Sequence, residues 1–215
     1  MFFRIAGDML HVVSRLVLAH RIRKSKNCVG ISCKTQELYM IVFLARYLDL
    51  FVNFVSLYNT FMKLSYLAFT GYLIYLMRVS KLYRQTYDVK GDSFPYWKYL
   101  LGPCFVMALI FNHEFTFMEI TWSFSIWLEA VAFVPQLDMM RKMKEVENLT
   151  SHYVFCLGAY RLFYIFEWTS KFMNNEHISW ISVSAGIIQI VLYADFFYYY
   201  ILAKLSNKPN VALPI

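Results

Sequence analysis

The chain has 215 residues, of which 59% are apolar and 16% are charged, with a formal net charge of +7 at pH 7. A soluble domain is roughly half apolar and about a quarter charged. Seven membrane-spanning helices of about 20 residues would use roughly 140 residues and leave about 75 for every loop and tail. This composition excludes a separate soluble domain and predicts a compact polytopic membrane protein.

Seven apolar stretches follow one another along the chain, each long enough for a membrane-spanning helix. The predicted spans are about 2–20, 37–57, 60–79, 94–111, 116–137, 152–173 and 178–205, followed by a tail at about 206–215. Short loops alternate with longer, basic loops, as expected when successive helices cross in opposite directions. We therefore predict an all-α membrane protein with a single transmembrane domain, residues 1–215.

The distribution of lysine and arginine predicts the orientation. Fifteen of these residues lie in one set of loops and the tail, whereas Arg4, Lys63 and Lys171 lie on the other side. Cytosolic loops are enriched in basic residues, so the N-terminus is predicted to be lumenal and the C-terminus cytosolic. The positive net charge is thus a topology signal and does not indicate nucleic-acid binding. Cys28 and Cys33 are expected to be reduced cytosolic thiols without a metal.

Ionisable side chains inside the spans are costly in lipid and usually face a cavity or one another. In the first span they recur at i, i+4, i+7 and i+11, which is one helical face. The polar faces carry Arg4, Asp8, His11 and Arg15; Arg46, Asp49 and Asn53; Glu119, Trp122 and Glu129; Tyr160, Arg161, Tyr164, Trp168 and Lys171, with Glu167 beside them; and Asp195. We expect these faces to converge on one polar core.

Basic residues at the lumenal rim and at membrane depth predict a funnel that is positive toward the lumen. Such a funnel suits an anionic ligand, and the planar guanidinium of arginine suits a carboxylate. Glu119 with Trp122 can hold a cation at the same rim by charge and by cation–π contact. The expected ligand therefore has one cationic end and several acidic groups.

Simpler interpretations stay open for single residues. Glu129 or Asp195 could neutralise Arg161 as an internal ion pair, and the Arg15 side chain could extend to the cytosolic headgroups. His11 is the side chain expected to titrate near neutral pH. It is either a neutral core histidine or a proton-linked group that makes an anionic ligand bind more tightly as the pH falls.

A faint internal repeat relates the two halves of the chain. Arg46–Phe51 resembles Arg161–Phe166, and each segment lies in the second helix of a three-helix unit. Two parallel three-helix repeats joined by a linker helix form the architecture of SWEET and PQ-loop transporters. Pro135-Gln136 ends the fifth predicted span, where proline breaks a helix and glutamine can satisfy freed backbone groups.

Further motifs follow in order along nearly the whole chain. They are Cys28–Ser32, Arg46–Phe51, Ser56–Thr60, Trp122–Ile126 with Leu128–Glu129, Val134–Leu137, Tyr160–Arg161 and Asp195–Tyr198. Together they resemble the ER lumen protein-retaining receptor (KDEL receptor) family. The resemblance implies a receptor without enzymatic activity. It would bind the C-terminal Lys/His-Asp-Glu-Leu signal of escaped ER proteins in the Golgi lumen, more tightly at acidic pH, and return them to the ER.

The residues and the resemblance predict three groups of site residues, and no cofactor. The ligand-binding group is Arg4, Arg46, Tyr47, Asp49, Asn53, Lys63, Glu119, Trp122, Tyr160, Arg161, Tyr164, Trp168 and Lys171. The pH-sensing and locking group is His11, Glu129 and Tyr160. The recycling group is Asp195, Lys204 and Lys208.

Within the ligand-binding group, the resemblance implies distinct contacts. Arg46, with Lys63 and Arg161, would bind the terminal carboxylate of the signal, and Arg4 and Lys171 would face its acidic side chains. Glu119 and Trp122 would hold its first, cationic residue.

The chain also departs from the family pattern. The departures are Arg15, Cys33, Glu167, Lys171, Ser179 and a tail without the paired lysines that engage the COPI coat. The implied partners are retrieval-signal peptides, the lipid bilayer of ER and Golgi membranes, and the COPI coat through the tail. The alternative function is a PQ-loop or SWEET-type transporter of a small solute, against which three buried arginines argue.

Overall fold

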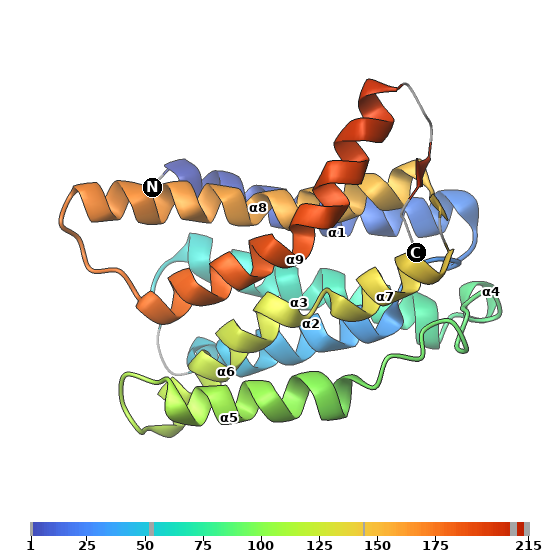
Figure 1. Ribbon diagram of the computed structural model, residues 1–215. Helices are drawn as coiled ribbons and strands as arrows, with labels where there is room; N and C mark the ends of the chain where they lie inside the picture. The colour runs from blue at the N-terminus through green and yellow to red at the C-terminus, as the bar shows by residue number, and fades with distance from the viewer. Residues whose placement is uncertain (1, 52–53, 144, 207–209, 213–215) are drawn as a thin grey trace.

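The computed structural model describes residues 2–51, 54–143, 145–206 and 210–212. Helices account for most of these residues (Figure 1), which confirms the predicted all-α class. One short antiparallel ribbon was not predicted: β1 (Glu145–Val146) pairs with β2 (Val211–Ala212) and holds the tail against the loop before α8.

The helical elements follow the predicted order of apolar stretches. They are α1 (Phe2–Ser25), α2 (Cys33–Arg46), the 3-10 turn η1 (Leu48–Phe51), α3 (Leu57–Arg78), α4 (Lys81–Arg84), the π-helical turn η2 (Trp97–Leu101), α5 (Gly102–Ile110), α6 (Phe117–Val131), α7 (Val134–Met143), α8 (Asn148–Met173) and α9 (Trp180–Leu205). Side-chain oxygens of Ser32, Ser56 and Thr116 cap α2, α3 and α6 by accepting backbone N–H bonds.

In the part of the chain that the structure describes, two helical stretches, Phe117–Met143 and Trp180–Ala203, are long and apolar enough to cross a membrane by length and composition. The other long helices carry more ionisable residues, and α1 alone contains Arg4, Asp8 and Arg15. These polar residues lower the hydropathy of the helices that surround the polar interior.

The second predicted span is wrong as a continuous helix over residues 37–57. Helix α2 ends at Arg46, and Tyr47 leaves helical geometry with φ −101° and ψ 21°. The following 3-10 turn carries Asp49 to Lys63 of α3, with 2.7 Å between carboxylate and ammonium. The apolar run continues through this turn, so hydrophobicity alone gave no sign of the break.

The predicted interruption at Pro135 is present, but the helical path continues beyond it. Helix α6 ends at Val131, and α7 starts at Val134 and extends to Met143. Proline is tolerated at the first turn of α7 because its missing N–H is not needed there.

Gln136 satisfies backbone groups of a different segment from the one predicted. Its Oε1 accepts from the Ser32 N–H at 2.8 Å, and its Nε2 donates to the Gly30 carbonyl at 2.7 Å. Its own N–H donates to Thr35 Oγ1 at 3.0 Å. The glutamine therefore fixes the loop that enters α2 against the start of α7.

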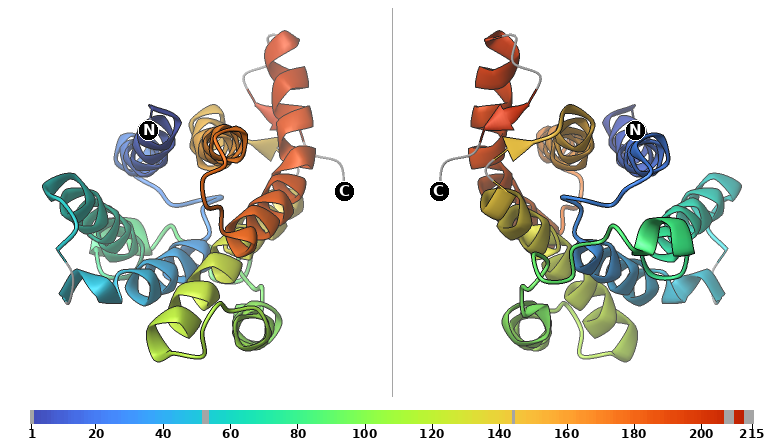
Figure 2. Two further views of the ribbon diagram at one scale, coloured as in Figure 1. Left: turned by 90° about the vertical axis from the view of Figure 1, so that its left-hand side faces the viewer. Right: turned by 90° about the vertical axis from the view of Figure 1, so that its right-hand side faces the viewer.

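The long helices enclose a common interior. Helix α1 packs along α8, α2 packs against α3 and α6, and α9 packs on α6 and α8 (Figures 1 and 2). Large apolar side chains such as Phe61, Phe105, Ile187 and Val191 are exposed on the outside. An apolar exterior around a polar interior is the arrangement expected of a helical bundle in lipid.

The loop between α1 and α2 is held by buried polar groups. Asp92 accepts hydrogen bonds from the Ser32 hydroxyl, the Lys34 N–H and the Tyr87 hydroxyl. Burial, together with the Asp92 carboxylate, raises the pKa of Tyr87. Burial also raises the pKa of the Cys28 thiol, so this free cysteine is protonated at neutral pH.

Candidate functional site

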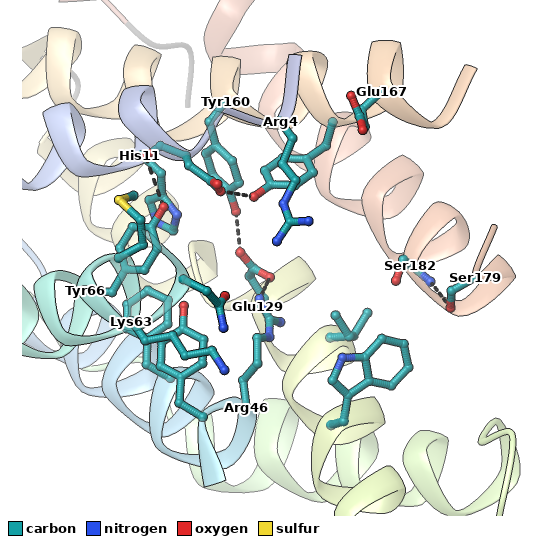
Figure 3. Close-up of a pocket in the computed structure, with 18 of the residues that line it drawn as sticks. Arg4, His11, Arg46, Lys63, Tyr66, Glu129, Tyr160, Glu167, Ser179 and Ser182 are labelled. Atoms are coloured by element: carbon teal, nitrogen blue, oxygen red, sulfur yellow. Dashed lines mark hydrogen bonds and ion pairs between the residues drawn. The ribbon is translucent and has the colours of Figure 1, made fainter. Parts of the chain in front are cut away.

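A cavity of about 610 Å³ lies among α1, α2, α3, α6, α8 and the start of α9 (Figure 3). It brings together most of the predicted site residues. Those that line it are Arg4, Asp8, His11, Arg46, Tyr47, Asp49, Lys63, Trp122, Glu129, Tyr160, Arg161, Tyr164, Trp168 and Lys171. Five basic and four acidic side chains line the cavity within the described part of the chain, Glu167 included. The net positive charge of the cavity lining is therefore smaller than the positive funnel that the sequence predicted.

Glu129 is the centre of the cavity floor. Its Oε2 lies 2.6 Å from Arg46 Nη1 and 3.1 Å from Arg161 Nη2, and its Oε1 accepts from the Tyr160 hydroxyl at 2.6 Å (Figure 3). Glu129 and Arg161 are 3% and 6% exposed. Two guanidinium groups thus share one buried carboxylate, which leaves one positive charge in excess. The interpretation of Glu129 as an ion-pair partner of Arg161 is confirmed.

Tyr160 connects the floor to α9. Its hydroxyl oxygen accepts from Arg161 Nη2 at 3.2 Å and from Gln189 Nε2 at 3.1 Å while the hydroxyl donates to Glu129. Every hydrogen-bonding position of this hydroxyl is therefore used. The resemblance implies a Tyr160–Glu129 lock that forms on binding of the signal; the contact itself is present in this structure.

Tyrosines from other helices satisfy Asp8. Its carboxylate accepts from the hydroxyls of Tyr58 and Tyr164, and its backbone carbonyl accepts from Tyr66. Tyr58 and Tyr66 are cavity residues to which the sequence analysis gave no role in the site. In a span rich in aromatic residues, the spacing of tyrosines does not distinguish those that form hydrogen bonds in the interior from those that face lipid.

A second ion pair joins Asp49 of η1 to Lys63 of α3. Both carboxylate oxygens of Asp49 accept from Lys63 Nζ, at 2.8 and 2.7 Å. Lys63 is 8% exposed, and its ammonium lies 5.6 Å from the centre of the Tyr47 ring. The lysine therefore already has a carboxylate partner at the edge of the floor.

Arg4 and Lys171 lie at the mouth of the cavity. Neither side chain forms an ion pair with another residue that the structure describes. Trp168 and Trp122 line the same mouth. This rim combines available cations with broad aromatic surfaces.

His11 and Arg15 lie side by side below the floor. The His11 ring stacks on Tyr160 with 4.2 Å between ring centres and 4° between planes. Arg15 is fully buried and donates to His11 Nε2 at 3.0 Å. The interpretation of Arg15 as a side chain that extends to the headgroups is wrong, because its guanidinium points into the core.

Other predicted residues lie outside the cavity wall. Glu119 is in the first turn of α6, where its carboxylate accepts from the His113 N–H at 3.5 Å, one turn before Trp122. Asp195 pairs with Arg141 of α7 at 3.0 Å, so of the two candidate partners for Arg161 the structure selects Glu129 and not Asp195.

Three predicted residues remain to be placed. Asn53 and Lys208 lie outside the described residues, and Lys204 lies in the last turn of α9. The structure adds residues that the sequence analysis did not place at the site. They are Phe43, Val55, Tyr58, Asn59, Met62, Tyr66, His177, Ile178 and Ser182.

Comparison with known proteins places the chain in a family. Residues 27–171 match the family described as ER lumen protein retaining receptor. The chain is 50% identical over 211 residues to an ER lumen protein-retaining receptor of Plasmodium falciparum, with 97% of this chain and 96% of the relative covered. It is 48% identical to the ER lumen protein-retaining receptor of Petunia hybrida, with 99% and 98% covered. The protein of that name from Drosophila melanogaster is also 48% identical, with 96% of each chain covered. The chain belongs to the ER lumen protein-retaining receptor family.

Proposed function

We propose that this chain is a receptor for the C-terminal Lys/His-Asp-Glu-Leu signal of ER-resident proteins. It would bind the signal in the Golgi lumen, more tightly at acidic pH, and return the bound protein to the ER. Membership of the receptor family supports this function. The observation that carries it is the floor of the cavity, where two arginines share the carboxylate of Glu129.

The excess charge at the floor suits the terminal carboxylate of a peptide. A carboxylate accepts two parallel bonds from a guanidinium, and such charge-assisted bonds are short and strong. Among the residues that the structure describes, Arg46 and Arg161 have one carboxylate between them, and Lys63 lies at the edge of the floor. A ligand carboxylate at this point would complete the neutralisation of the two arginines.

The rest of the signal would lie toward the mouth. Arg4 and Lys171 would contact the acidic side chains, because both lack a carboxylate partner among the described residues. Trp122 would contact the first, cationic residue through its ring face, with Glu119 one turn earlier on α6. In this arrangement the ligand runs from the rim to the floor.

The proposed architecture is a bundle of seven transmembrane helices formed by two three-helix repeats and a linker helix. A helix starts within or close to each predicted span. Arg46 in α2 and Arg161 in α8 hold corresponding positions in the predicted repeats and meet at Glu129. The cavity would then open to the lumen, with the N-terminus on that side and the C-terminus in the cytosol.

Recycling would involve the opposite end of the molecule. Asp195 pairs with Arg141, and both side chains are about half exposed. This pair, together with Lys204 at the end of α9 and Lys208 of the tail, would act in retrograde transport between ER and Golgi membranes. Because the tail lacks the paired lysines of the family, contact with the COPI coat would have to use other residues.

The alternative, a transporter of a small solute, is less well supported. A neutral solute requires hydroxyl partners and stacking surfaces, whereas nine charged side chains line this cavity in the described part of the chain. The relatives compared above are named as receptors.

Binding of labelled peptides to the purified protein between pH 5 and 7.5 tests the proposal. A peptide that ends in Lys-Asp-Glu-Leu should bind more tightly as the pH falls. The same peptide with a C-terminal amide should bind at least about a hundredfold more weakly, because it cannot neutralise the arginines. Equal binding of acid and amide, or affinity that rises with pH, would refute the proposed site.

Matched arginine variants show whether a loss of peptide affinity comes from the cavity floor itself. Arg46→Ala should reduce binding of the acid peptide by a similar factor. Arg141→Ala, which removes an exposed arginine from α7, should leave it unchanged. Equal loss in both variants would indicate a general effect of arginine removal and would contradict the carboxylate assignment.

A further inference from the structure

Arg15 is an unusual buried cation. It is 0% exposed, and no carboxylate pairs with it among the described residues. Its Nη1 donates to Gln36 Oε1 at 3.0 Å, its Nη2 donates to His11 Nε2 at 3.0 Å, and its guanidinium lies 4.1 Å from the centre of the Tyr39 ring. Neutral acceptors and an aromatic face therefore surround the charge.

The contact with Arg15 defines which nitrogen of His11 carries the proton. A guanidinium can only donate hydrogen bonds, so Nε2 must accept. The imidazole is then neutral, with its proton on Nδ1. Uptake of a second proton at Nε2 would bring two N–H donors together at 3.0 Å.

The buried surroundings of Arg15 keep its guanidinium from moving away from a protonated His11. Gln36, which holds the guanidinium, is itself fully buried and donates to the Tyr153 hydroxyl at 3.0 Å. Movement of Arg15 would therefore break a second buried hydrogen bond and leave Gln36 without its donor.

Other titratable and charged groups face His11 from each neighbouring helix. They are Asp8 on α1, Tyr39 and Arg46 on α2, Tyr66 on α3, Glu129 on α6, and Tyr160 and Arg161 on α8. The two carboxylates in this set are already engaged, Asp8 by tyrosine hydroxyls and Glu129 by two arginines. Neither offers His11 a free counter-ion.

The position of His11 is coupled to the ligand site through Tyr160. The two rings stack, and the Tyr160 hydroxyl donates to the carboxylate that Arg46 and Arg161 share. A change in the charge of His11 therefore acts on the floor of the cavity through one intervening side chain.

We infer that Arg15 is a positioning residue that holds His11 as a neutral acceptor and thereby sets how acidic the lumen must be before the signal binds tightly. This inference rests on the proposed function. A receptor with an apolar residue at this position would gain affinity at a higher pH.

The test compares pH profiles of peptide binding for the wild-type protein and Arg15→Met, from pH 4.5 to 8. Methionine keeps much of the side-chain length but removes every donor. The rise in affinity should begin about one pH unit higher in the variant, which corresponds to up to about a tenfold difference in Kd at intermediate pH for one proton. Arg141→Met is the matched control and should keep the wild-type profile.

A second variant keeps the arginine. Gln36→Glu supplies Arg15 with a carboxylate, which draws the guanidinium away from His11 Nε2. The increase in peptide affinity should therefore begin at a higher pH in this variant too. This variant decides the question if Arg15→Met does not fold. Superimposable pH profiles for the wild type and the folded variants would overturn the role of Arg15 and leave the proposed function intact. A wild type that binds no signal peptide at any pH would overturn the proposed function, and this inference with it.

Discussion

At the scale of single residues, each of two carboxylates in the cavity accepts hydrogen bonds from more than one side chain. Glu129 accepts from Arg46, Arg161 and Tyr160, and Asp8 accepts from two tyrosines. A buried charge without such partners would cost several kcal/mol. The same carboxylates therefore stabilise the bundle and prepare the arginines for a ligand.

Replacement of Glu129 should affect folding as well as binding. Glu129→Gln leaves the buried guanidinium of Arg161 and the partly buried one of Arg46 without a carboxylate, and breaking a buried pair typically costs about 3–5 kcal/mol. We expect a clear decrease in thermal stability of the purified protein, measured by thiol-reactive dye unfolding in detergent. Asp138→Asn, which removes an exposed i,i+4 pair with Lys142, should change the unfolding free energy by less than about 1 kcal/mol. Equal stability of Glu129→Gln and wild type would contradict the structural role of the shared carboxylate.

The sequence predicted these residues with uneven success. Charged residues at membrane depth are rare enough to be recognised, so Arg46, Glu129 and Arg161 could be identified before their geometry was known. The partners themselves could not be assigned, because Asp195 and Glu129 were equally good candidates for Arg161. Tyr58 and Tyr66 were missed since aromatic residues also fill lipid-facing positions.

At the scale of helices, glycines allow close approach behind the cavity wall. A Cβ on Gly186 of α9 would lie 2.6 Å from Cζ3 and 2.8 Å from Cη2 of Trp168. Real Cβ atoms do not approach so closely, so Trp168 or α9 would have to move. Gly186 thus supports the position of a cavity residue without lining the cavity itself.

Gly186→Ala should therefore weaken binding of the signal peptide. Because the indole of Trp168 is displaced into or along the cavity, we expect roughly a tenfold increase in Kd. Gly71→Ala in α3 is the control, since a Cβ there meets only the flexible end of Met40 at 3.4 Å. Unchanged affinity in Gly186→Ala would show that Trp168 does not contact the ligand.

Helix boundaries were predictable where composition changes and not where it stays apolar. The break near Pro135 was visible in the sequence because proline has a fixed steric consequence. The end of α2 at Arg46 was not visible, because the tertiary pairing of Asp49 with Lys63 competes with an apolar run that favours helix. The ribbon of β1 with β2 is only two residues long on each strand and has no pattern to detect.

At the scale of the whole molecule, composition already predicted that any ligand site must lie inside the bundle. The apolar exterior and the cavity of about 610 Å³ agree with this expectation. The order of the helices follows the predicted spans, whereas their mutual packing depends on side-chain contacts that no single sequence reveals.

The proposed orientation has a direct test. An epitope tag at the C-terminus should be accessible to antibody in cells whose plasma membrane alone is permeabilised, because the basic loops and the tail are assigned to the cytosol. A tag at the N-terminus should become accessible only after full permeabilisation. The opposite pattern would place the cavity on the wrong side for lumenal peptides.

The shared carboxylate at the floor has a thermodynamic consequence for the whole receptor. Because Arg46 and Arg161 join α2 to α8 through Glu129, a ligand carboxylate at the same point becomes a second tie between the two halves. Ligand binding then stabilises the fold by mass action, by about 2.7 kcal/mol at a hundredfold excess over Kd. Cargo would thus act as a temporary structural component, and the empty receptor would be the less stable form of the protein.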